Sequence, residues 1–296
     1  NDLTQQSFHT TDTSRLNYVV RIIENTAELM NDSEMDDSED DKYNFVNEDN
    51  LSENELELLE LKKEYEKNLN EIKNKVTIKW GDTQDPALVL EVTKEKDIVF
   101  HLAAQSHVGH SLFNPYETVV NDVVSTLNIL EAGRKNNTKR IVHAGSSEIY
   151  GNPKYVPIDE EHPLQPRSPY AAAKASSESL LESYYHSYGL PVVKSRFFNI
   201  YGPRQGLDQA IPKFILQSLN DKNITIYGTG SQTRDYTYVA DAVRAYGILG
   251  IQKNLEGKVI NFGSGKEIQI KDLAAFLNVP FKEKTVDLVK SEYRHF

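Results

Sequence analysis

From residue 76 onward, short apolar segments alternate with longer stretches of helical periodicity, and this alternation constrains the fold more than any other feature. Five segments have the length and character of buried strands: residues 76–80, 97–103, 140–144, 192–198 and 258–262. Residues 115–134 and 168–188 have the length and apolar spacing of helices. Strands joined by crossover-sized helical connections form parallel sheets covered on both faces. The sequence therefore predicts an α/β fold with a doubly wound, Rossmann-like parallel sheet.

Beyond about residue 199 the pattern changes to Gly- and Pro-rich loops with shorter elements. We interpret this part as a smaller C-terminal substrate-binding lobe over the strand ends, where open parallel sheets bind ligands. The expected division is a divergent N-terminal part of the Rossmann domain (1–75), a Rossmann core with the catalytic residues (76–199 with 235–262), and the lobe (200–234 with 263–296).

The negative charge of the chain is concentrated in its first quarter. Residues 1–75 carry 20 acidic and 8 basic side chains, a net charge of −12, whereas the whole chain has −11. Residues 31–41 contain one apolar side chain, Met35, and are too polar to bury a core, so we expect a mobile, solvated insertion, with a binding tail as the alternative. Residues 52–75 have the pattern of an amphipathic helix opened by Ser52 and Glu55.

Composition removes several classes of function. An acidic chain without clustered Lys or Arg is not expected to bind nucleic acid or a membrane surface. No apolar segment approaches the ~18 residues of a membrane span, and the first residues lack the pattern of a leader, so we expect a soluble cytoplasmic protein. The absence of cysteine excludes disulfides and thiolate catalysis, and we expect no metal site.

Two segments carry groups suited to acid–base chemistry. The first runs from a strand into a turn that bears Ser146, Glu148 and Tyr150, and the second opens a helix with Tyr170 and Lys174. Residues four apart lie on one helical face, so the Lys174 ammonium is expected beside the Tyr170 phenol. A nearby positive charge favours the phenolate and would bring the pKa of Tyr170 down toward neutral pH. A Tyr-x-x-x-Lys pair taken alone is more often an ordinary surface pair.

Five motifs in order resemble the extended short-chain dehydrogenase/reductase family of NAD-dependent nucleotide-sugar epimerases and dehydratases. The resemblance runs from about Val76 to Asp272. Its motifs are His-Leu-Ala-Ala-Gln at 101–105, Ser146 with Tyr150-Gly151, Tyr170 with Lys174, Arg-Phe-Phe-Asn-Ile-Tyr-Gly-Pro-Arg at 196–204, and Gly-Thr-Gly-Ser-Gln-Thr-Arg-Asp-Tyr at 228–236.

The resemblance implies a catalytic role for three of these side chains. Tyr170 would take the proton of the sugar 4-hydroxyl while C4 gives hydride to NAD. Lys174 would hold the nicotinamide ribose and lower the tyrosine pKa, and Ser146 would hydrogen-bond the same oxygen. The cofactor takes the hydride back within each cycle and is expected to stay bound.

Further positions match the family's binding residues. Ala103 and Ala104 would let the backbone pass beside the cofactor. Asp82 matches an adenine contact, with a turn or capping aspartate as the alternative, and Asp49 matches a ribose-binding acid, with a merely solvated side chain as the alternative.

On the substrate side, Asn199 would bind the nucleoside diphosphate and Arg234 would clamp its pyrophosphate. Tyr227 matches the base pocket but could equally be a core aromatic. Arg204 is either a second anion contact or, as we slightly favour, a loop salt bridge.

Glu148 bears on the type of reaction. Dehydratases of the family carry a carboxylate here, which can remove the C5 proton made acidic by a transient 4-ketone, whereas an epimerase needs none. Ser147 replaces the aspartate that often serves as acid, a form that also occurs in dehydratases and decarboxylases. We lean toward elimination over 4-epimerisation, and a structural role for Glu148 remains the bland alternative.

The N-terminal part departs from the family. The family begins with a strand and Gly-x-x-Gly-x-x-Gly, which lets a pyrophosphate approach backbone N–H groups. Here no glycine precedes Gly81; residues 18–23 could be the first strand, but Glu24 and Glu28 follow it. Three explanations stay open: the true N-terminus and the last strand–helix segment are missing and NAD affinity is impaired; the protein is a non-catalytic nucleotide-sugar binder; or a different cradle holds NAD.

Finally, the helices at 115–134 and 168–188 match those that form a four-helix dimer interface in the family. Leu180, Leu181, Tyr184 and Tyr185 would leave extra apolar surface on the second helix. A homodimer is therefore expected.

Overall fold

The computed structural model describes residues 19–22, 69, 76–207, 209–278 and 287–289. Its central element is a four-stranded parallel sheet in the order β3-β4-β5-β9. The strands are β3 (Ile98–His101), β4 (Arg140–Ser146), β5 (Val192–Phe197) and β9 (Val259–Phe262). Four of the five expected strands thus form the parallel sheet, and the predicted α/β class is confirmed.

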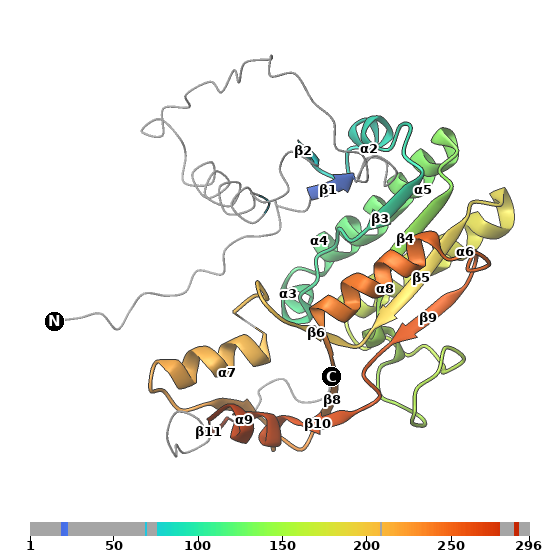
Figure 1. The fold of residues 1–296 in the computed structure, drawn as a ribbon. Helices are drawn as coiled ribbons and strands as arrows, with labels where there is room; N and C mark the ends of the chain where they lie inside the picture. Colours follow the sequence, from blue (N-terminus) through green and yellow to red (C-terminus); the bar gives the residue numbers. More distant parts are fainter. Residues whose placement is uncertain (1–18, 23–68, 70–75, 208, 279–286, 290–296) are drawn as a thin grey trace, which may run out of the picture.

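Helices cover both faces of this sheet (Figure 1). Helix α8 (Val239–Ile251) packs on one face against β3 and β4. Helices α5 (Ser125–Asn136) and α6 (Pro169–Tyr188) pack on the other, and α2 (Pro86–Val92) lies against α5. The side chains between sheet and helices, such as Leu130, Ile141 and Val192, are fully buried.

Local signals explain where α6 begins and ends. The Ser168 hydroxyl accepts a hydrogen bond from Ala171 N (3.1 Å), and Pro169 fills the first helical position, where a missing N–H costs nothing. Gly189 ends the helix at φ 65°, a left-handed conformation that favours glycine. The N-terminal cap fixes the first turn of α6, which bears Tyr170.

The helix expected at 115–134 contains an irregularity. It consists of α4 (Pro115–Val119), a π-helical segment η5 (Val120–Val124) and α5, preceded by the short α3 (Val108–Phe113). A π turn inserts one extra residue and often marks a functional site. Here it turns Asn121 and Asp122 inward, where both are buried.

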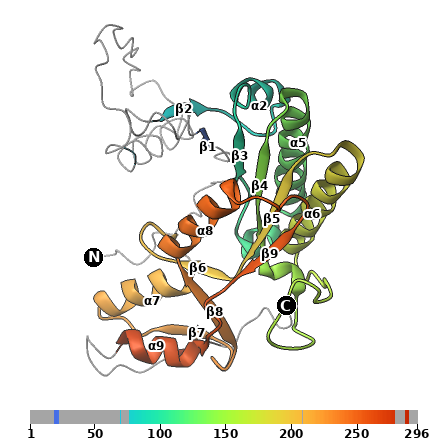
Figure 2. The ribbon, with the colours of Figure 1, turned by 45° about the vertical axis from the view of Figure 1, so that its right-hand side comes forward.

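The C-terminal part forms a separate layer below the strand ends (Figure 2). A three-stranded sheet joins β6 (Asn199–Tyr201), β8 (Thr233–Tyr238) and β10 (Glu267–Gln269), and β7 (Thr225–Tyr227) pairs with β11 (Asp287–Val289). Helices α7 (Ala210–Leu219) and α9 (Ile270–Asn278) pack on one another. This part has its own core around Phe214, Ile226 and Leu273. Because β5 leads into β6 and β9 into β10, it follows the carboxyl ends of the parallel strands.

Two expectations about strands are wrong. Strand β2 (Thr77–Trp80) pairs antiparallel with β1 (Val19–Ile22) in a two-stranded sheet of its own, so residues 18–23 do not provide the first parallel strand and residues 76–80 are not a buried one. The reason lies in the alternation of Thr77 and Lys79 with Ile78 and Trp80, which gives a strand with one polar face, as antiparallel sheets tolerate. The expected insertion at 31–41, the helix at 52–75 and Asp49 lie outside the described residues.

A third correction concerns α6. Leu181 and Tyr184 belong to the core between α5, α6 and the sheet, with Leu180 and Tyr185 partly buried against it, so they do not form the free apolar surface expected. Within the described ranges, no helix is long and apolar enough to cross a membrane.

Candidate active site

The three residues expected to act on the substrate lie together at the carboxyl end of β4. Ser146 is the last residue of β4, and Tyr170 and Lys174 occupy the first two turns of α6. A hydrogen bond joins the Ser146 and Tyr170 side chains. The Ser146 hydroxyl also accepts Glu148 N (3.2 Å), which caps the short 3₁₀ helix η6 (Ser147–Tyr150).

Lys174 is held rigidly in this site. Its side chain is 3% exposed, its Nζ donates to Ala144 O (3.0 Å), and Nζ lies 5.9 Å from the centre of the Tyr170 ring. Burial lowers the pKa of Lys174, while the charges of Asp122 and Glu178 act in the opposite direction. An ammonium has three donors, so Lys174 has donors to spare for a ligand next to Tyr170.

The pKa of Tyr170 differs from the expectation. Burial raises the pKa of this phenol above its usual value, the hydrogen bond from Ser146 lowers it in part, and the charges of Asp122 and Glu148 raise it further. The predicted lowering of the Tyr170 pKa is therefore wrong for the protein alone, because desolvation of the phenolate is the largest influence on it.

Glu148 belongs to the same group of residues. It lies on η6, is partly exposed, and interacts electrostatically with Tyr170. A carboxylate near a phenol that is hydrogen-bonded to a serine is a set of groups that can exchange protons with a bound alcohol or ketone.

The cofactor-side candidates fall into two groups. Ala103 and Ala104 follow β3 at the same edge of the sheet and are partly exposed, as a backbone that contacts a ligand would be. Asp82 is exposed, and its carboxylate accepts a hydrogen bond from Gln84 N (2.7 Å). This contact stabilises a turn, which is the alternative role considered for Asp82. Lys174, with donors to spare, and the two alanines, with their small side chains, are groups that could hold a ribose and a flat ring. The segment after residue 22, where the family has its glycine-rich loop, lies outside the described residues.

The substrate-side candidates Asn199 and Arg234 lie on adjacent strands of the lower sheet. In the parallel register of β6 and β8, Asn199 is opposite Tyr236, two residues after Arg234. Asn199 is partly buried, whereas Arg234 is exposed and uses Nη1 to donate to Thr233 O (2.8 Å). An amide and a guanidinium are thus placed close to one another beyond the ends of the parallel strands.

The two remaining candidates are on the surface. Tyr227 is 52% exposed, which excludes the core role that was its alternative; its hydroxyl accepts from Lys213 Nζ (3.2 Å), and the ammonium lies 5.0 Å from the ring centre. Arg204 is exposed at φ 68° and forms no ion pair with another described residue, so the favoured salt bridge is not found within them.

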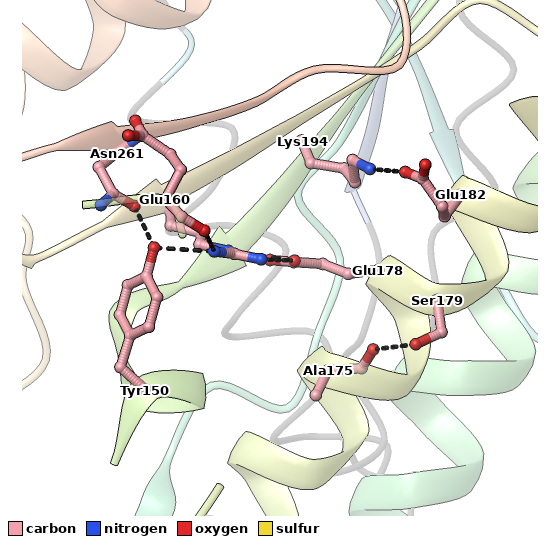
Figure 3. Close-up of polar contacts among 9 residues, drawn as sticks. Tyr150, Glu160, Ala175, Glu178, Ser179, Glu182, Lys194 and Asn261 are labelled. Carbon is pink, nitrogen blue, oxygen red and sulfur yellow. Dashed lines mark hydrogen bonds and ion pairs between the residues drawn. The ribbon is translucent and has the colours of Figure 1, made fainter. Parts of the chain in front are cut away.

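A buried network that the sequence did not predict supports the turn that bears Ser146 and Glu148 (Figure 3). Arg196 on β5 donates Nε and Nη2 to the Glu178 carboxylate (3.1 and 2.7 Å) and Nη1 to the Tyr150 hydroxyl (2.8 Å). The Tyr150 hydroxyl donates in turn to Asn261 Oδ1 (2.6 Å), and Asn261 N donates to Glu160 Oε1 (2.7 Å). The signal in the sequence was the presence of two cations, Lys194 and Arg196, inside the otherwise apolar strand 192–198.

This network ties together the elements that carry the site. Tyr150 ends η6, which bears Glu148; Glu178 lies one turn after Lys174 on α6; and Asn261 belongs to β9. A guanidinium with both carboxylate and phenol partners fixes their relative positions, because its donors form a rigid fork. We conclude that it holds the turn with Ser146 and Glu148 against the helix with Tyr170 and Lys174.

Three buried titratable side chains beneath the site were also missed. His101 and His143 are neighbours on β3 and β4, with ring centres 5.2 Å apart, and Asp122 comes from η5. Burial lowers the pKa of both histidines, that of His101 to about 3, so they are neutral. No sequence pattern indicates that these three side chains are buried, since histidine and aspartate are common on protein surfaces.

Comparison with known proteins agrees with this geometry. Residues 37–294 match the family model described as GDP-mannose 4,6 dehydratase. The chain belongs to this family. It is therefore also a member of the extended short-chain dehydrogenases/reductases that its motifs resemble.

Relatives within the family include both reaction types. The chain is 36% identical over 221 residues to a dTDP-D-glucose 4,6-dehydratase from Bos taurus, covering 73% of this chain and 62% of that protein. It is 36% identical over 231 residues to a putative UDP-glucose 4-epimerase from Methanocaldococcus jannaschii, covering 76% and 74%. The chain thus spans about 62% of the length of the first of these relatives.

Solved structures show the same fold with ligands. A UDP-glucuronic acid 4-epimerase from Bacillus cereus in complex with UDP-glucuronic acid and NAD has a TM-score of 0.72 at 33% identity, covering 79% of this chain and 74% of that one. DesIV, a dTDP-glucose 4,6-dehydratase from Streptomyces venezuelae with NAD and TYD bound, has a TM-score of 0.69 at 29% identity, covering 73% and 67%.

Proposed function

We propose that the chain is an NAD-dependent nucleotide-sugar epimerase/dehydratase that acts through a transient 4-keto sugar, with 4,6-dehydration as the favoured outcome. The observation that carries this proposal is the grouping of Ser146, Tyr170 and Lys174 at the carboxyl end of the parallel sheet, with Glu148 interacting with Tyr170. The dehydratase and epimerase relatives support the substrate class of nucleoside-diphosphate sugars.

The proposed roles follow from the contacts. Lys174 would hold the nicotinamide ribose with the donors that Ala144 O leaves available, and Ala103 and Ala104 would face the cofactor. NAD, when bound, supplies a hydride acceptor that later returns the hydride, and a positive charge beside the Tyr170 phenol. Tyr170 would accept the proton of the sugar 4-hydroxyl, and the Ser146 hydroxyl would stabilise its oxygen as a hydrogen-bond donor.

Glu148 decides the outcome in this proposal. Its carboxylate would remove the C5 proton of the keto sugar, and hydroxide would leave C6 and depart as water with a proton from solvent. Return of the hydride to C6 and of the proton from Glu148 to C5 would then give the 4-keto-6-deoxy product. Asn199 and Arg234 would bind the diphosphate, and Tyr227 would lie near the base. The proposal does not depend on Arg204 or Asp82. The 4-epimerase alternative requires only Ser146, Tyr170 and Lys174. In that case Glu148 is a hydrogen-bond acceptor with a structural role.

The experiment that tests the proposal is mass spectrometry of small molecules released by acid from the purified protein, combined with product analysis on dTDP-glucose and UDP-glucose. We expect bound NAD(H) and a 4-keto-6-deoxy product, with Tyr170→Phe lowering turnover at least ~100-fold. Nucleotide-sugar protection against thermal unfolding without cofactor or product would indicate a non-catalytic binder, which is one of the explanations for the lack of glycine before Gly81.

We also propose a homodimer, formed through the helices at 113–136. Large apolar side chains are exposed along this segment: Phe113, Tyr116, Val119, Val124 and Leu127. From Tyr116 onward, their steps of three to five residues, with the longest across η5, keep these side chains on one side of the continuous helix. Light scattering at micromolar concentration should give twice the mass of the chain, and Tyr116→Asp should weaken the dimer while Ile251→Asp on α8 should not. A monomeric mass would refute this proposal.

A further inference from the structure

Asp122 is a buried carboxylate with one unused oxygen. The residue is 1% exposed, and Oδ1 accepts Gln105 N (2.7 Å) from the loop that follows β3. Oδ2 is buried without a hydrogen-bond partner among the residues that the structure describes. Leaving a carboxylate oxygen buried and unpaired is costly, so it is kept only where another charge or ligand compensates.

The π turn explains how this carboxylate reaches the core. In η5 the backbone carbonyl of Asp122 accepts from Thr126 Oγ1 (2.7 Å) and from Ser177 Oγ on α6 (3.3 Å). The side chain of Asp122 is thereby fixed between the loop at 103–105 and the α6 face that carries Lys174 and Tyr170. It is anchored on both sides before any ligand binds.

Each element packed against Lys174 places a titratable side chain near its ammonium group. Asp122 and Glu178 are the two carboxylates that favour its ammonium form, from η5 and from α6 itself. The other titratable neighbours are Tyr170 on α6, whose raised pKa keeps it an uncharged phenol, and His101 on β3 and His143 on β4, which are both neutral. Glu178 is already engaged by the Arg196 guanidinium, with contacts of 2.7 to 3.1 Å. Burial raises the pKa of Asp122, whereas the Lys174 charge and the hydrogen bond from Gln105 N lower it. Asp122 is therefore the carboxylate whose charge depends on Lys174.

We propose that Asp122 is a positioning residue of the active site: its carboxylate stabilises the buried Lys174 ammonium and fixes the 103–105 loop beside it. The inference rests on the proposed function, because it is in that function that Lys174 and this loop would contact the cofactor. The two contacts are separable, since an amide in place of the carboxylate keeps an acceptor for Gln105 N but removes the charge.

The test is the titration of Lys174 in the purified full chain. Lysine labelled with ¹³C at Cε is observed by NMR over pH 6 to 11, and the Lys174 signal is assigned by its loss in Lys174→Met. In Asp122→Asn we expect the pKa of Lys174 to fall relative to the unchanged protein. In Asp97→Asn, which alters an exposed partner of Lys139, we expect no change. An unchanged Lys174 pKa in Asp122→Asn, with the fold intact by circular dichroism, would overturn the inference.

The same variants separate this inference from the proposed function. The titration requires no turnover, so it succeeds or fails even if the protein proves to be a non-catalytic binder. If turnover is found, Asp122→Asn should lower kcat roughly tenfold, the scale of coupling between neighbouring charged groups, and move the alkaline limb of the pH profile. Should Asp122→Asn fail to fold, Asp122→Glu, which keeps the charge, is expected to restore both the fold and the Lys174 pKa; a Lys174 pKa in that variant unlike that of the unchanged protein would count against the inference.

Discussion

At the scale of single residues, Glu148 is the side chain that we expect to determine whether the reaction is elimination or epimerisation. We expect Glu148→Gln to lower formation of the 4-keto-6-deoxy product ~100-fold or more, because the amide cannot accept the C5 proton. Solvent deuterium incorporation at C5 should fall in parallel, while oxidation at C4 persists as absorbance at 340 nm. Glu161→Gln, an exposed change in the next loop, serves as the control. Unchanged product formation in Glu148→Gln would leave the carboxylate a structural role.

Tyr150 tests the network around Arg196. Its hydroxyl bridges Arg196 Nη1 and Asn261 Oδ1 in the core, so Tyr150→Phe leaves a cationic donor and an amide oxygen short of a partner. We expect the free energy of unfolding to fall by about 1–3 kcal/mol, the usual cost of an unsatisfied buried group. Urea denaturation measures it. Tyr155→Phe removes a hydroxyl bonded to Asp159 at the surface and should change stability by less than ~0.5 kcal/mol; equal effects of the two variants would contradict the assignment.

At the scale of elements, the site depends on how closely β4, β5 and α6 approach one another. Gly145 lies where a Cβ would be 2.2 Å from Ser195 O of β5 and 2.8 Å from Glu178 Oε1 of α6. We expect Gly145→Ala to destabilise the protein by at least ~2 kcal/mol, since the backbone of β5 cannot yield as a side chain would. Thermal unfolding followed by circular dichroism measures the change.

Gly247 on the exposed side of α8 provides the matched control. A Cβ there meets nothing within 4 Å, so Gly247→Ala should stabilise the protein by about 0.5–1 kcal/mol through helix propensity alone. Similar destabilisation in both variants would mean that close packing at Gly145 is not the cause.

At the scale of the whole molecule, stability should depend on pH above the range where carboxylates titrate. Burial lowers the pKa of His101 to about 3 and that of His143 well below its usual value, so the unfolded chain binds more protons than the folded one below about pH 6.5. Stability therefore rises with pH in this window and is lost as pH falls through it. We expect a lower midpoint of urea unfolding at pH 5.5 than at pH 7.5.

His143→Leu should reduce this pH dependence, because both ring nitrogens of His143 are buried without a partner among the described residues. The exposed His186, paired with Glu182, provides the comparison: His186→Gln should leave the difference between pH 5.5 and pH 7.5 unchanged. An unchanged difference in His143→Leu would assign the acid sensitivity to other groups.

Local patterns in the sequence determined the four parallel strands, α6 and its caps, and the presence of Tyr170 and Lys174 on one helical face. These depend on neighbours a few residues away, and helical and strand periods express them directly. Only the tertiary structure decided the rest. The partners of Arg196 lie 18 and 46 residues away, on α6 and η6. Burial reversed the predicted direction of the Tyr170 pKa shift, and the pairing of β1 with β2 removed residues 76–80 from the parallel sheet. Such features arise from contacts and desolvation between distant segments, which no short-range pattern records.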